Sequence, residues 1–259
     1  KWVAAAAQDG ARLVVLPENV FLFNGKAMRG LAESAAQQTI LQRVKELAIE
    51  HAIYLVVGSH PLINRPDGEL VDNNRVRQSC LVFSPSGELV KRYDKIHLFD
   101  VMVKDKAGSY KESASIEPGD ISSPIIEVDG FKVGLSICYD VRFAYLHRAL
   151  ARAGAQILTV PAAFSHVTGA AHWHTLLHAR TIETGCFVLA PAQTGTHAAS
   201  RGPSRRTYGH SLVVAPWGEI LADAGTEACV CVVDLDLEKV EEARRRVPSL
   251  THDREFDGP

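Results

Sequence analysis

The sequence predicts an α/β protein in which two mixed sheets are stacked face to face and covered by outer helices. Short runs rich in β-branched residues alternate with longer stretches whose apolar residues recur at spacings of three and four. About ten strands are predicted, which is more than one small sheet holds, and hairpin turns join some of them while helices separate others. Helices outside two packed sheets bury every apolar face in the simplest way.

The predicted strands are short and are bounded by turn residues. They occupy residues 12–16, 54–59, 80–85, 88–93, 124–130, 132–138, 156–164, 186–192, 210–218 and 229–237. Gly and Pro in the sequences PSGE and APWGE predict turns that each join two consecutive strands.

The predicted helices are fewer and longer, and we expect them to cover the sheets. They occupy residues 37–52, 142–155, 170–185 and 237–247, and the second and third end close to Gly154 and Gly185. Residues 1–10 resemble the second half of an amphipathic helix and lack an initiating Met, so we expect a further segment before Lys1. No repeat or linker-like stretch divides the chain, which predicts a single domain over residues 1–259.

Composition excludes several classes of function. The chain has 46% apolar and 22% charged residues, and 28 Lys and Arg against 30 Asp and Glu give a net charge of -2. Such a balance provides no positive field for nucleic acid. No apolar run approaches the roughly 18 residues that cross a bilayer, and the start does not resemble a signal peptide. We therefore expect a cytoplasmic protein without a nucleic-acid or membrane partner.

The five cysteines do not form a disulfide or zinc pattern. Their number is odd, their spacing is wide, and no C-x-x-C pair is present. Reduced, buried thiols are the simplest interpretation. Cys229 and Cys231 alternate with Val in the sequence ACVCVVDLDL, so we expect them as small apolar side chains on one face of a strand.

Glu18 follows a buried strand and a Pro that ends it, in the sequence ARLVVLPENVF. Ligand crevices form at the carboxyl ends of such strands, where a half-shielded carboxylate can act as a general base. A turn glutamate facing water is the alternative.

Lys95 lies in an unusually apolar and aromatic neighbourhood, close to Tyr93, Ile96 and Phe99. A lysine normally stays solvated, and a cation held in such surroundings could stabilise an oxyanion. The alternative is a lysine at a strand edge that extends into solvent or pairs with Asp94.

Cys138 ends an apolar strand directly before a predicted helix that starts near Arg142. This strand-to-helix elbow aims backbone N–H groups at the side chain, so we expect a nucleophile whose thiol pKa is lowered. A buried structural thiol is the alternative, although the polar Tyr139 and Asp140 disfavour it.

Other polar residues give weaker signals. Glu112, in the sequence SYKESASIEPGD, is a candidate second carboxylate or a solvated loop residue. His172, His174 and His178 could suggest a metal face, but no H-E-x-x-H motif or carboxylate set accompanies them, and we predict no metal site. Nothing marks one of these histidines as a base paired with Cys138.

Three segments, LPENVF, KRYDKIHLFD and GLSICYDVRF, resemble in the same order the three signature regions of the nitrilase superfamily of carbon-nitrogen hydrolases. The sequences TVPAAF, ARTIET and YGHSLVVAPWG extend this resemblance toward the branch that contains deaminated glutathione amidase and omega-amidase. The resemblance implies a four-layer α-β-β-α sandwich whose subunits form dimers or higher homo-oligomers. Compared with the family pattern, the first strand and half of the following helix are absent here.

The resemblance also implies roles for individual residues. Glu18 would be the general base and acid, Lys95 the oxyanion-stabilising cation, Cys138 the nucleophile and Glu112 a second carboxylate that orients the site. Tyr139 and Phe164 would contact the substrate, and Arg142 would bind its carboxylate unless it serves a structural ion pair. No metal or organic cofactor is implied.

The function implied is hydrolysis of a small primary amide that carries a carboxylate, such as deaminated glutathione or 2-oxoglutaramate, with release of ammonia through a thioester. Hydrolysis of N-carbamoyl amino acids or nitriles by the same residues is the alternative activity. A catalytically silent binding module of the same fold is the alternative outside enzymes, and the presence of all four candidate catalytic residues disfavours it.

Overall fold

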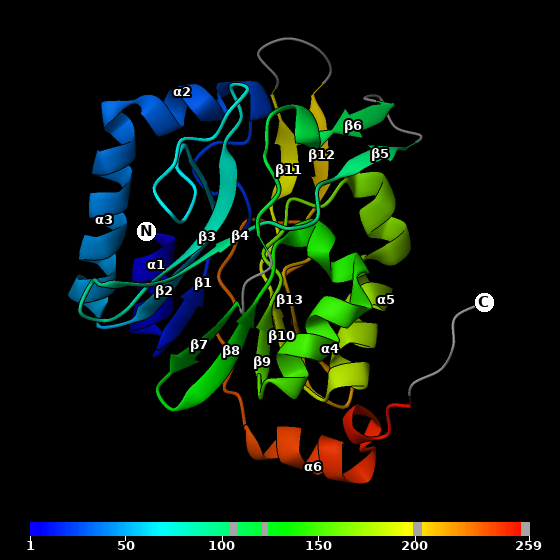
Figure 1. Ribbon diagram of the computed structural model, residues 1–259. Coiled ribbons are helices and arrows are strands. Elements are labelled where there is room, and N and C mark those ends of the chain that lie inside the picture. The colour runs from blue at the N-terminus through cyan, green and yellow to red at the C-terminus, as the bar shows by residue number, and fades with distance from the viewer. Residues whose placement is uncertain (104–107, 121–123, 199–203, 255–259) are drawn as a thin grey trace.

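A computed structural model describes residues 1–103, 108–120, 124–198 and 204–254 of the chain. Two sheets dominate it, one of four strands in the order β1-β2-β3-β4 and one of six strands in the order β14-β13-β10-β9-β8-β7. Helices α1 and α3 lie outside the first sheet, and α4 and α5 lie outside the second (Figure 1). The predicted α/β sandwich of two mixed sheets is confirmed.

The first sheet alternates its side chains between two apolar clusters. It consists of β1 (Leu13–Val15), β2 (Tyr54–Leu62), β3 (Arg77–Phe83) and β4 (Leu89–Asp94). β1 runs parallel to β2, and the other neighbouring strands are antiparallel. Val56 packs toward the second sheet, whereas the adjacent Leu55 packs outward with α1 (Trp2–Gln8) and α3 (Ala35–His51). Both faces of the sheet are therefore buried.

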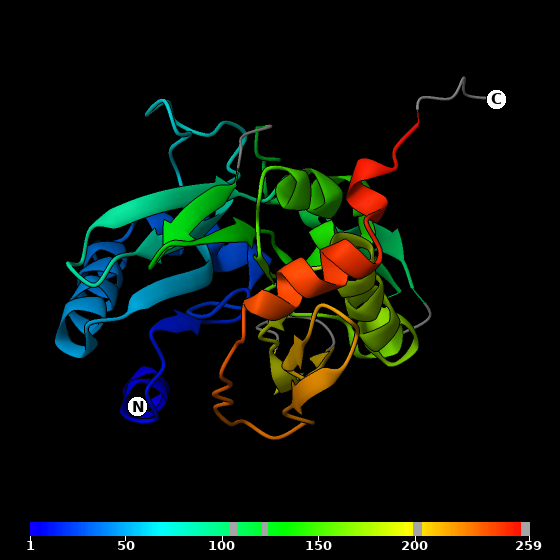
Figure 2. The same cartoon turned by 90° about the horizontal axis from the view of Figure 1, so that it is seen from below.

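The second sheet has a parallel centre with antiparallel flanks. It consists of β7 (Ile125–Val128), β8 (Phe131–Leu135), β9 (Ile157–Thr159), β10 (Phe187–Ala190), β13 (Leu212–Val214) and β14 (Ile220–Asp223). β8, β9 and β10 run parallel, as expected where helices connect them. α4 (Ala144–Arg152) and α5 (His166–Thr184) provide those connections and cover the outer face. α6 (Glu238–Arg246) lies at the lower end of the sandwich and is close to the viewer in Figure 2.

Several short elements were not anticipated from the sequence. They are α2 (Met28–Glu33), the hairpin of β5 (Asp100–Met102) and β6 (Ser109–Lys111), the hairpin of β11 (Thr194–His197) and β12 (Arg205–Tyr208), strand β14, and the 3-10 helices η1 (Gly25–Ala27), η2 (Glu112–Ala114), η3 (Cys138–Arg142) and η4 (Ser249–Thr251). Strands and helices of three to six residues carry too little periodicity to separate them from loops.

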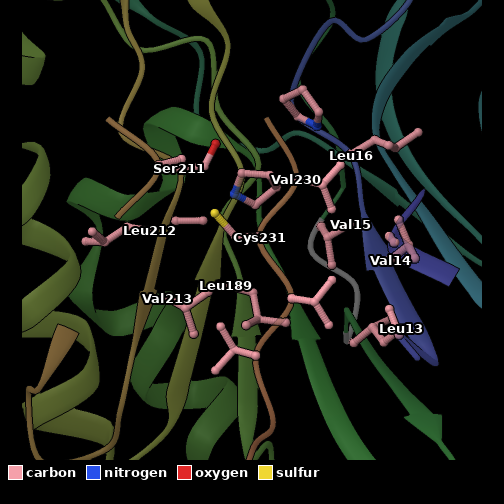
Figure 3. Close-up of a pocket in the computed structure, with 18 of the residues that line it drawn as sticks. Leu13, Val14, Val15, Leu16, Leu189, Ser211, Leu212, Val213, Val230 and Cys231 are labelled. Carbon is pink, nitrogen blue, oxygen red and sulfur yellow. The ribbon is translucent and has the colours of Figure 1, made fainter. Parts of the chain in front are cut away.

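The prediction of a strand at residues 229–237 is wrong. This segment has no strand pairing, and both Cys229 and Cys231 are exposed. An apolar cavity of about 690 Å³ borders it, and the opposite wall of the cavity is β1, which pairs with β2 alone among the described strands. Figure 3 shows Val230 and Cys231 in this cavity. Without a neighbour at the roughly 4.8 Å that strand pairing requires, the alternating sequence cannot form a sheet edge.

Candidate active site

The side chains of Glu18, Lys95, Glu112 and Cys138 line one small cavity of about 40 Å³. Glu18 follows β1, Lys95 follows β4 directly, Glu112 begins η2 and Cys138 begins η3. The first sheet thus delivers a carboxylate and a cation, and the second sheet delivers the thiol. This cavity is not the large apolar one of Figure 3, which contains none of the four residues.

The backbone around Glu18 is fixed from several sides. Asn19 adopts a left-handed conformation with φ 57°, and its N–H donates to Ser59 Oγ at 2.7 Å. Gln193 Nε2 donates to the Glu18 carbonyl oxygen at 3.0 Å. Gly58 allows close approach, because a Cβ there would lie 2.1 Å from the Leu16 carbonyl oxygen. None of these supports was evident from the sequence, because each joins segments far apart in the chain.

Lys95 is nearly fully buried, with 1% of its surface exposed. Its Nζ donates to Glu18 Oε1 at 2.7 Å and to Glu112 Oε1 at 2.9 Å. The second oxygen of each carboxylate also accepts a backbone hydrogen bond, from Ala163 N at 2.8 Å to Glu18 and from Phe99 N at 2.6 Å to Glu112. Both carboxylates are therefore held at two points, and one cation serves both.

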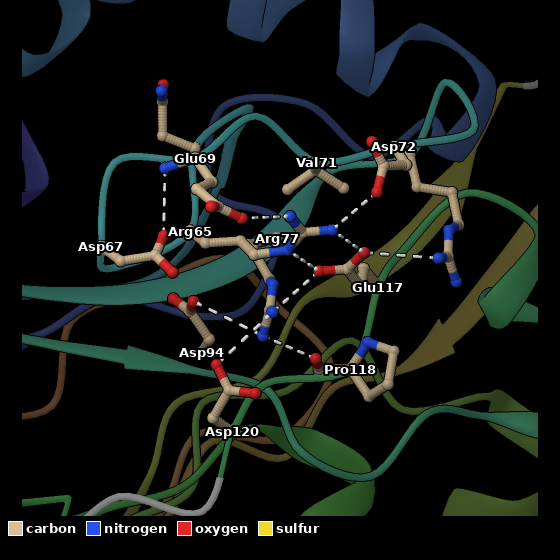
Figure 4. A network of polar contacts seen from close by, with 12 residues as sticks. Arg65, Asp67, Glu69, Val71, Asp72, Arg77, Asp94, Glu117, Pro118 and Asp120 are labelled. Atoms are coloured by element: carbon tan, nitrogen blue, oxygen red, sulfur yellow. Dashed lines mark hydrogen bonds and ion pairs between the residues drawn. The ribbon is translucent and has the colours of Figure 1, made fainter.

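The loop of residues 117–120 holds Lys95 from the other side. Gly119 N–H donates to the Lys95 carbonyl oxygen at 2.7 Å, and a Cβ at Gly119 would lie 2.2 Å from the Asp94 carbonyl oxygen. Arg77 anchors this loop through Glu117 at 2.7 Å and the Pro118 carbonyl oxygen at 2.6 Å (Figure 4). A buried ion network outside the cavity thus positions the backbone from which Lys95 extends.

The electrostatics of the cavity reflect two carboxylates that share one ammonium group. Burial raises the pKa of Glu112, although Lys95 opposes this effect. Burial also disfavours the charged form of Lys95, but the carboxylates of Glu112 and Glu18 outweigh it and hold the pKa of Lys95 well above its ordinary value. Lys95 therefore stays an ammonium ion.

Cys138 occupies a sharp turn between β8 and η3. Its φ of 47° lies in the left-handed region, which is unusual for a residue with a side chain, and its N–H donates to the Pro161 carbonyl oxygen at 2.9 Å. Asp140 is fully buried and fastens the turn by accepting the Ile137 N–H at 2.8 Å and the Tyr93 hydroxyl at 2.7 Å. The elbow predicted from the sequence is present, whereas its anchoring aspartate was missed because a single sequence does not separate it from a solvated one.

The expected lowering of the Cys138 pKa is corrected. Burial raises the pKa of the thiol well above its ordinary value, the Glu18 carboxylate raises it further, and Lys95 opposes them without outweighing them. The reason is that one turn of 3-10 helix offers a weak field, whereas desolvation and a nearby carboxylate both disfavour a thiolate. The Cys138 side chain is therefore a neutral thiol beside the Glu18 carboxylate.

The three predicted substrate-binding residues differ in position. Tyr139 and Phe164 line the cavity with Cys138, whereas Arg142 does not. The Arg142 guanidinium carbon lies 5.5 Å from the Phe164 ring centroid and 5.9 Å from that of Tyr139. Its Nη2 lies 3.2 Å from His172 Nδ1.

Arg205 lines the cavity, and the sequence did not single it out. Its guanidinium carbon lies 4.5 Å from the ring centroid of Phe23 and 4.8 Å from that of Tyr110. The only signal was a pair of basic residues before the sequence TYGHS, and such pairs are common on protein surfaces.

One group of residues has ligands suited to a metal ion within the described part of the chain. His174 Nε2 and His210 Nδ1 lie 3.0 and 2.9 Å from oxygens of Asp223. Both imidazoles can donate hydrogen bonds to this carboxylate, which explains the cluster without an ion. None of the three residues lines the cavity of Cys138, and the absence of a metal stays a prediction. Among the described helices, none is long and apolar enough to cross a bilayer.

Comparison with known sequences identifies a family. The model of the carbon-nitrogen hydrolase family matches residues 1–245. The deaminated glutathione amidase of Yersinia enterocolitica is 40% identical over 247 residues, which cover 95% of this chain and 83% of that protein. Omega-amidase NIT2 of Homo sapiens is 38% identical over 257 residues, which cover 98% of this chain and 87% of that protein.

Comparison with solved structures agrees. The C. elegans NitFhit protein matches with a TM-score of 0.85 and 34% identity over 98% of this chain, which spans 59% of NitFhit. Saccharomyces cerevisiae Nit3, a member of the nitrilase superfamily, matches with a TM-score of 0.81 and 32% identity, over 98% of this chain and 86% of Nit3. A mutant amidase from Nesterenkonia sp. AN1, with acrylamide added at its active site cysteine, matches with a TM-score of 0.74 and 27% identity, over 95% of this chain and 88% of that one.

Proposed function

Since the chain belongs to the carbon-nitrogen hydrolase family, we propose that residues 1–259 act as one amidase domain whose catalytic residues are Glu18, Lys95, Glu112 and Cys138. The observation that supports this proposal is the shared cavity, in which a carboxylate and an ammonium group adjoin a buried thiol. A protein that only binds ligands has no need for these costly buried charges beside a nucleophile.

The first half of the reaction forms a thioester. Glu18 accepts the thiol proton while Cys138 Sγ forms a bond to the amide carbon, so a thiolate is not needed beforehand. The charge that develops on the amide oxygen is stabilised by Lys95 and by the Tyr139 N–H at the start of η3. Lys95 suits this role because two of its three ammonium hydrogens bind Glu18 and Glu112, which leaves the third for the substrate.

The second half returns the enzyme to its starting state. Glu18 gives its proton to the nitrogen as the C–N bond breaks, and ammonia leaves. Water then attacks the thioester carbon and gives a proton to Glu18. Glu18 passes this proton to the departing sulfur as the C–S bond breaks, so the acid is released and the thiol and carboxylate are restored. Among the proposed catalytic residues, Glu112 contacts Lys95 and fixes the direction of its ammonium group.

We propose small amides that carry a carboxylate as substrates, in line with the names of the relatives. Tyr139 and Phe164 form part of the cavity wall that the substrate would contact, and the Arg142 guanidinium lies within 5.9 Å of both ring centroids, where its charge would attract an anion.

A substrate screen tests the proposal. Ammonia release is measured for the primary amides 2-oxoglutaramate and glutaric acid monoamide, and for carbamoyl amino acids and nitriles as competing substrate classes. Deaminated glutathione is not a primary amide and is followed by formation of its acid product. We expect turnover of the carboxylate-bearing amides, and trapping by mass spectrometry should place the acyl group on Cys138. Preferred release of ammonia with carbon dioxide from a carbamoyl amino acid, or turnover of nitriles alone, would contradict the proposed substrate class.

A further inference from the structure

Arg205 is the one charged residue among the described cavity-lining residues that lies outside the proposed catalytic set. It begins β12, and the rings of Phe23 and Tyr110 hold its guanidinium through cation–π contacts. No carboxylate in residues 1–103, 108–120, 124–198 and 204–254 forms an ion pair with it. Its position in the cavity is therefore fixed while its charge is not neutralised.

Other partly or fully buried arginines in the first half of the chain are paired. Arg77 lies 2.7 Å from a Glu117 oxygen, and Arg65 lies 2.8 Å from the same carboxylate. An unpaired arginine at a cavity wall is different, because its planar donors remain available to an anion that enters. The structure thus provides a place for a negative group that the described residues do not supply.

The charges of the cavity indicate where such a group could bind. Lys95 is already engaged by two carboxylates, because its Nζ lies 2.7 Å from Glu18 Oε1 and 2.9 Å from Glu112 Oε1. His197 does not compete as a cation, because burial and the nearby Arg205 lower its pKa. Of the two cations that line the cavity, Arg205 is therefore the one that no described carboxylate engages, and an anion that enters can pair with it.

We infer that Arg205 is the main anchor for the carboxylate of the substrate and that Arg142, next to the rings of Tyr139 and Phe164, contributes less. This inference rests on the proposed amidase function and deepens it, because it states why the enzyme would prefer an amide with an acidic end. Arg142 is the weaker candidate since it does not line the cavity and already contacts His172.

The test compares two amides of equal length, glutaric acid monoamide and valeramide, which differ in the carboxylate. For Arg205→Gln we expect kcat/KM to fall about 10- to 100-fold on the acidic amide, as for loss of a hydrogen bond to a charged group, and less than about threefold on valeramide. Arg205→Lys keeps the charge without the planar fork, so its kcat/KM on the acidic amide should lie between those of wild type and Arg205→Gln.

Arg206→Gln is the matched control. It removes the same charge one residue further along β12, from an exposed side chain that does not line the cavity, and both substrates should keep their wild-type rates. Equal losses on both substrates in Arg205→Gln, or a larger selective loss in Arg142→Gln, would overturn the inference.

Binding of glutarate to Cys138→Ala protein, measured by calorimetry, separates the inference from the proposed function. We expect glutarate to bind and the additional change Arg205→Gln to weaken binding about tenfold or more. If wild-type protein hydrolyses neither amide but glutarate binding still depends on Arg205, the proposed activity fails and the anion site stands. If glutarate binding is unaffected by Arg205→Gln, the inference fails whatever the activity.

Discussion

Two buried ion clusters lie side by side in the first sheet, and they are built in opposite ways. In the cluster of Figure 4, the Glu117 carboxylate faces three arginines, at 2.7 Å from Arg77, 2.8 Å from Arg65 and 3.3 Å from Arg75. Hydrogen bonding to Arg65 lowers the pKa of Glu117 more than burial raises it. The Glu117 carboxylate is thus held by three cations, while Arg65 also pairs with Glu69 and Asp72, and Arg77 with Asp120.

The proposed catalytic cluster has a single cation, because the Lys95 ammonium group alone serves the carboxylates of Glu18 and Glu112. Burial raises the pKa of Glu112 there, and the neighbouring space contains a thiol instead of further partners. The comparison teaches that buried charge alone does not mark a reactive site. A saturated cluster holds the backbone, whereas an undersupplied one next to a cavity can exchange protons with a ligand.

The largest effect is expected from removing the nucleophile. Cys138→Ala should lower turnover by at least about 10⁴-fold, because no other group can form the thioester, while the melting temperature changes little. Cys186→Ala, at another buried thiol, is the control and should keep its turnover. Amide hydrolysis by pure Cys138→Ala protein, measured as ammonia release, would contradict the mechanism.

Replacing one cation in each cluster tests the comparison directly. Lys95→Met leaves two buried carboxylates without a cation, so we expect a loss of about 3–5 kcal/mol in the free energy of unfolding and at least about 10³-fold in kcat. Arg77→Met leaves Glu117 with Arg65 and Arg75. We therefore expect a smaller loss in the free energy of unfolding than for Lys95→Met, and a decrease in kcat of less than about tenfold.

Urea unfolding and steady-state kinetics on the folded proteins measure both quantities. If Arg77→Met abolished turnover while the protein remained folded, the saturated cluster would have to be counted as part of the catalytic machinery.

A smaller effect is expected from Gly58, which allows the chain before Glu18 to approach β2. In Gly58→Ala the new methyl would meet the Leu16 carbonyl oxygen, and we expect the free energy of unfolding to fall by about 1–3 kcal/mol together with a drop in kcat. Gly30→Ala is the control, because no atom lies within 4 Å of its Cβ and the site is helical. It should leave kcat unchanged and stabilise by about 0.5–1 kcal/mol. A normal kcat in Gly58→Ala would show that Glu18 does not depend on this approach.

The smallest effect concerns pH. The pKa of Cys138 is raised in the folded protein, so above the ordinary thiol value of 9.0 the unfolded chain releases a proton that the folded protein keeps. Stability should therefore fall as the pH rises past 9, more steeply in wild type than in Cys138→Ala, by at most about 1.4 kcal/mol per pH unit. Thiolate absorbance at 240 nm should not differ between the two proteins at neutral pH. A thiolate signal from Cys138 at pH 7 would contradict a neutral resting thiol.

The sequence determined by itself those features that depend on local patterns. Apolar periodicity located the main strands and helices, Pro17 marked the end of β1, and the elbow at Cys138 followed from an apolar strand that ends in polar residues. Motif resemblance then indicated the family that the comparisons show. These features can be read from one sequence because neighbouring residues alone produce them.

The tertiary structure decided everything that depends on distant partners. The segment at 229–237 alternates like a strand but lacks a neighbour, and the elbow that was expected to lower the pKa of Cys138 instead lies beside the Glu18 carboxylate in a desolvated cavity. Arg205 and Glu117 are both charged residues in polar loops or short strands. Arg205 lines the cavity without a carboxylate partner among the described residues, whereas Glu117 faces three arginines. Pairing, burial and charge balance are properties of contacts between segments, and a linear sequence does not state those contacts.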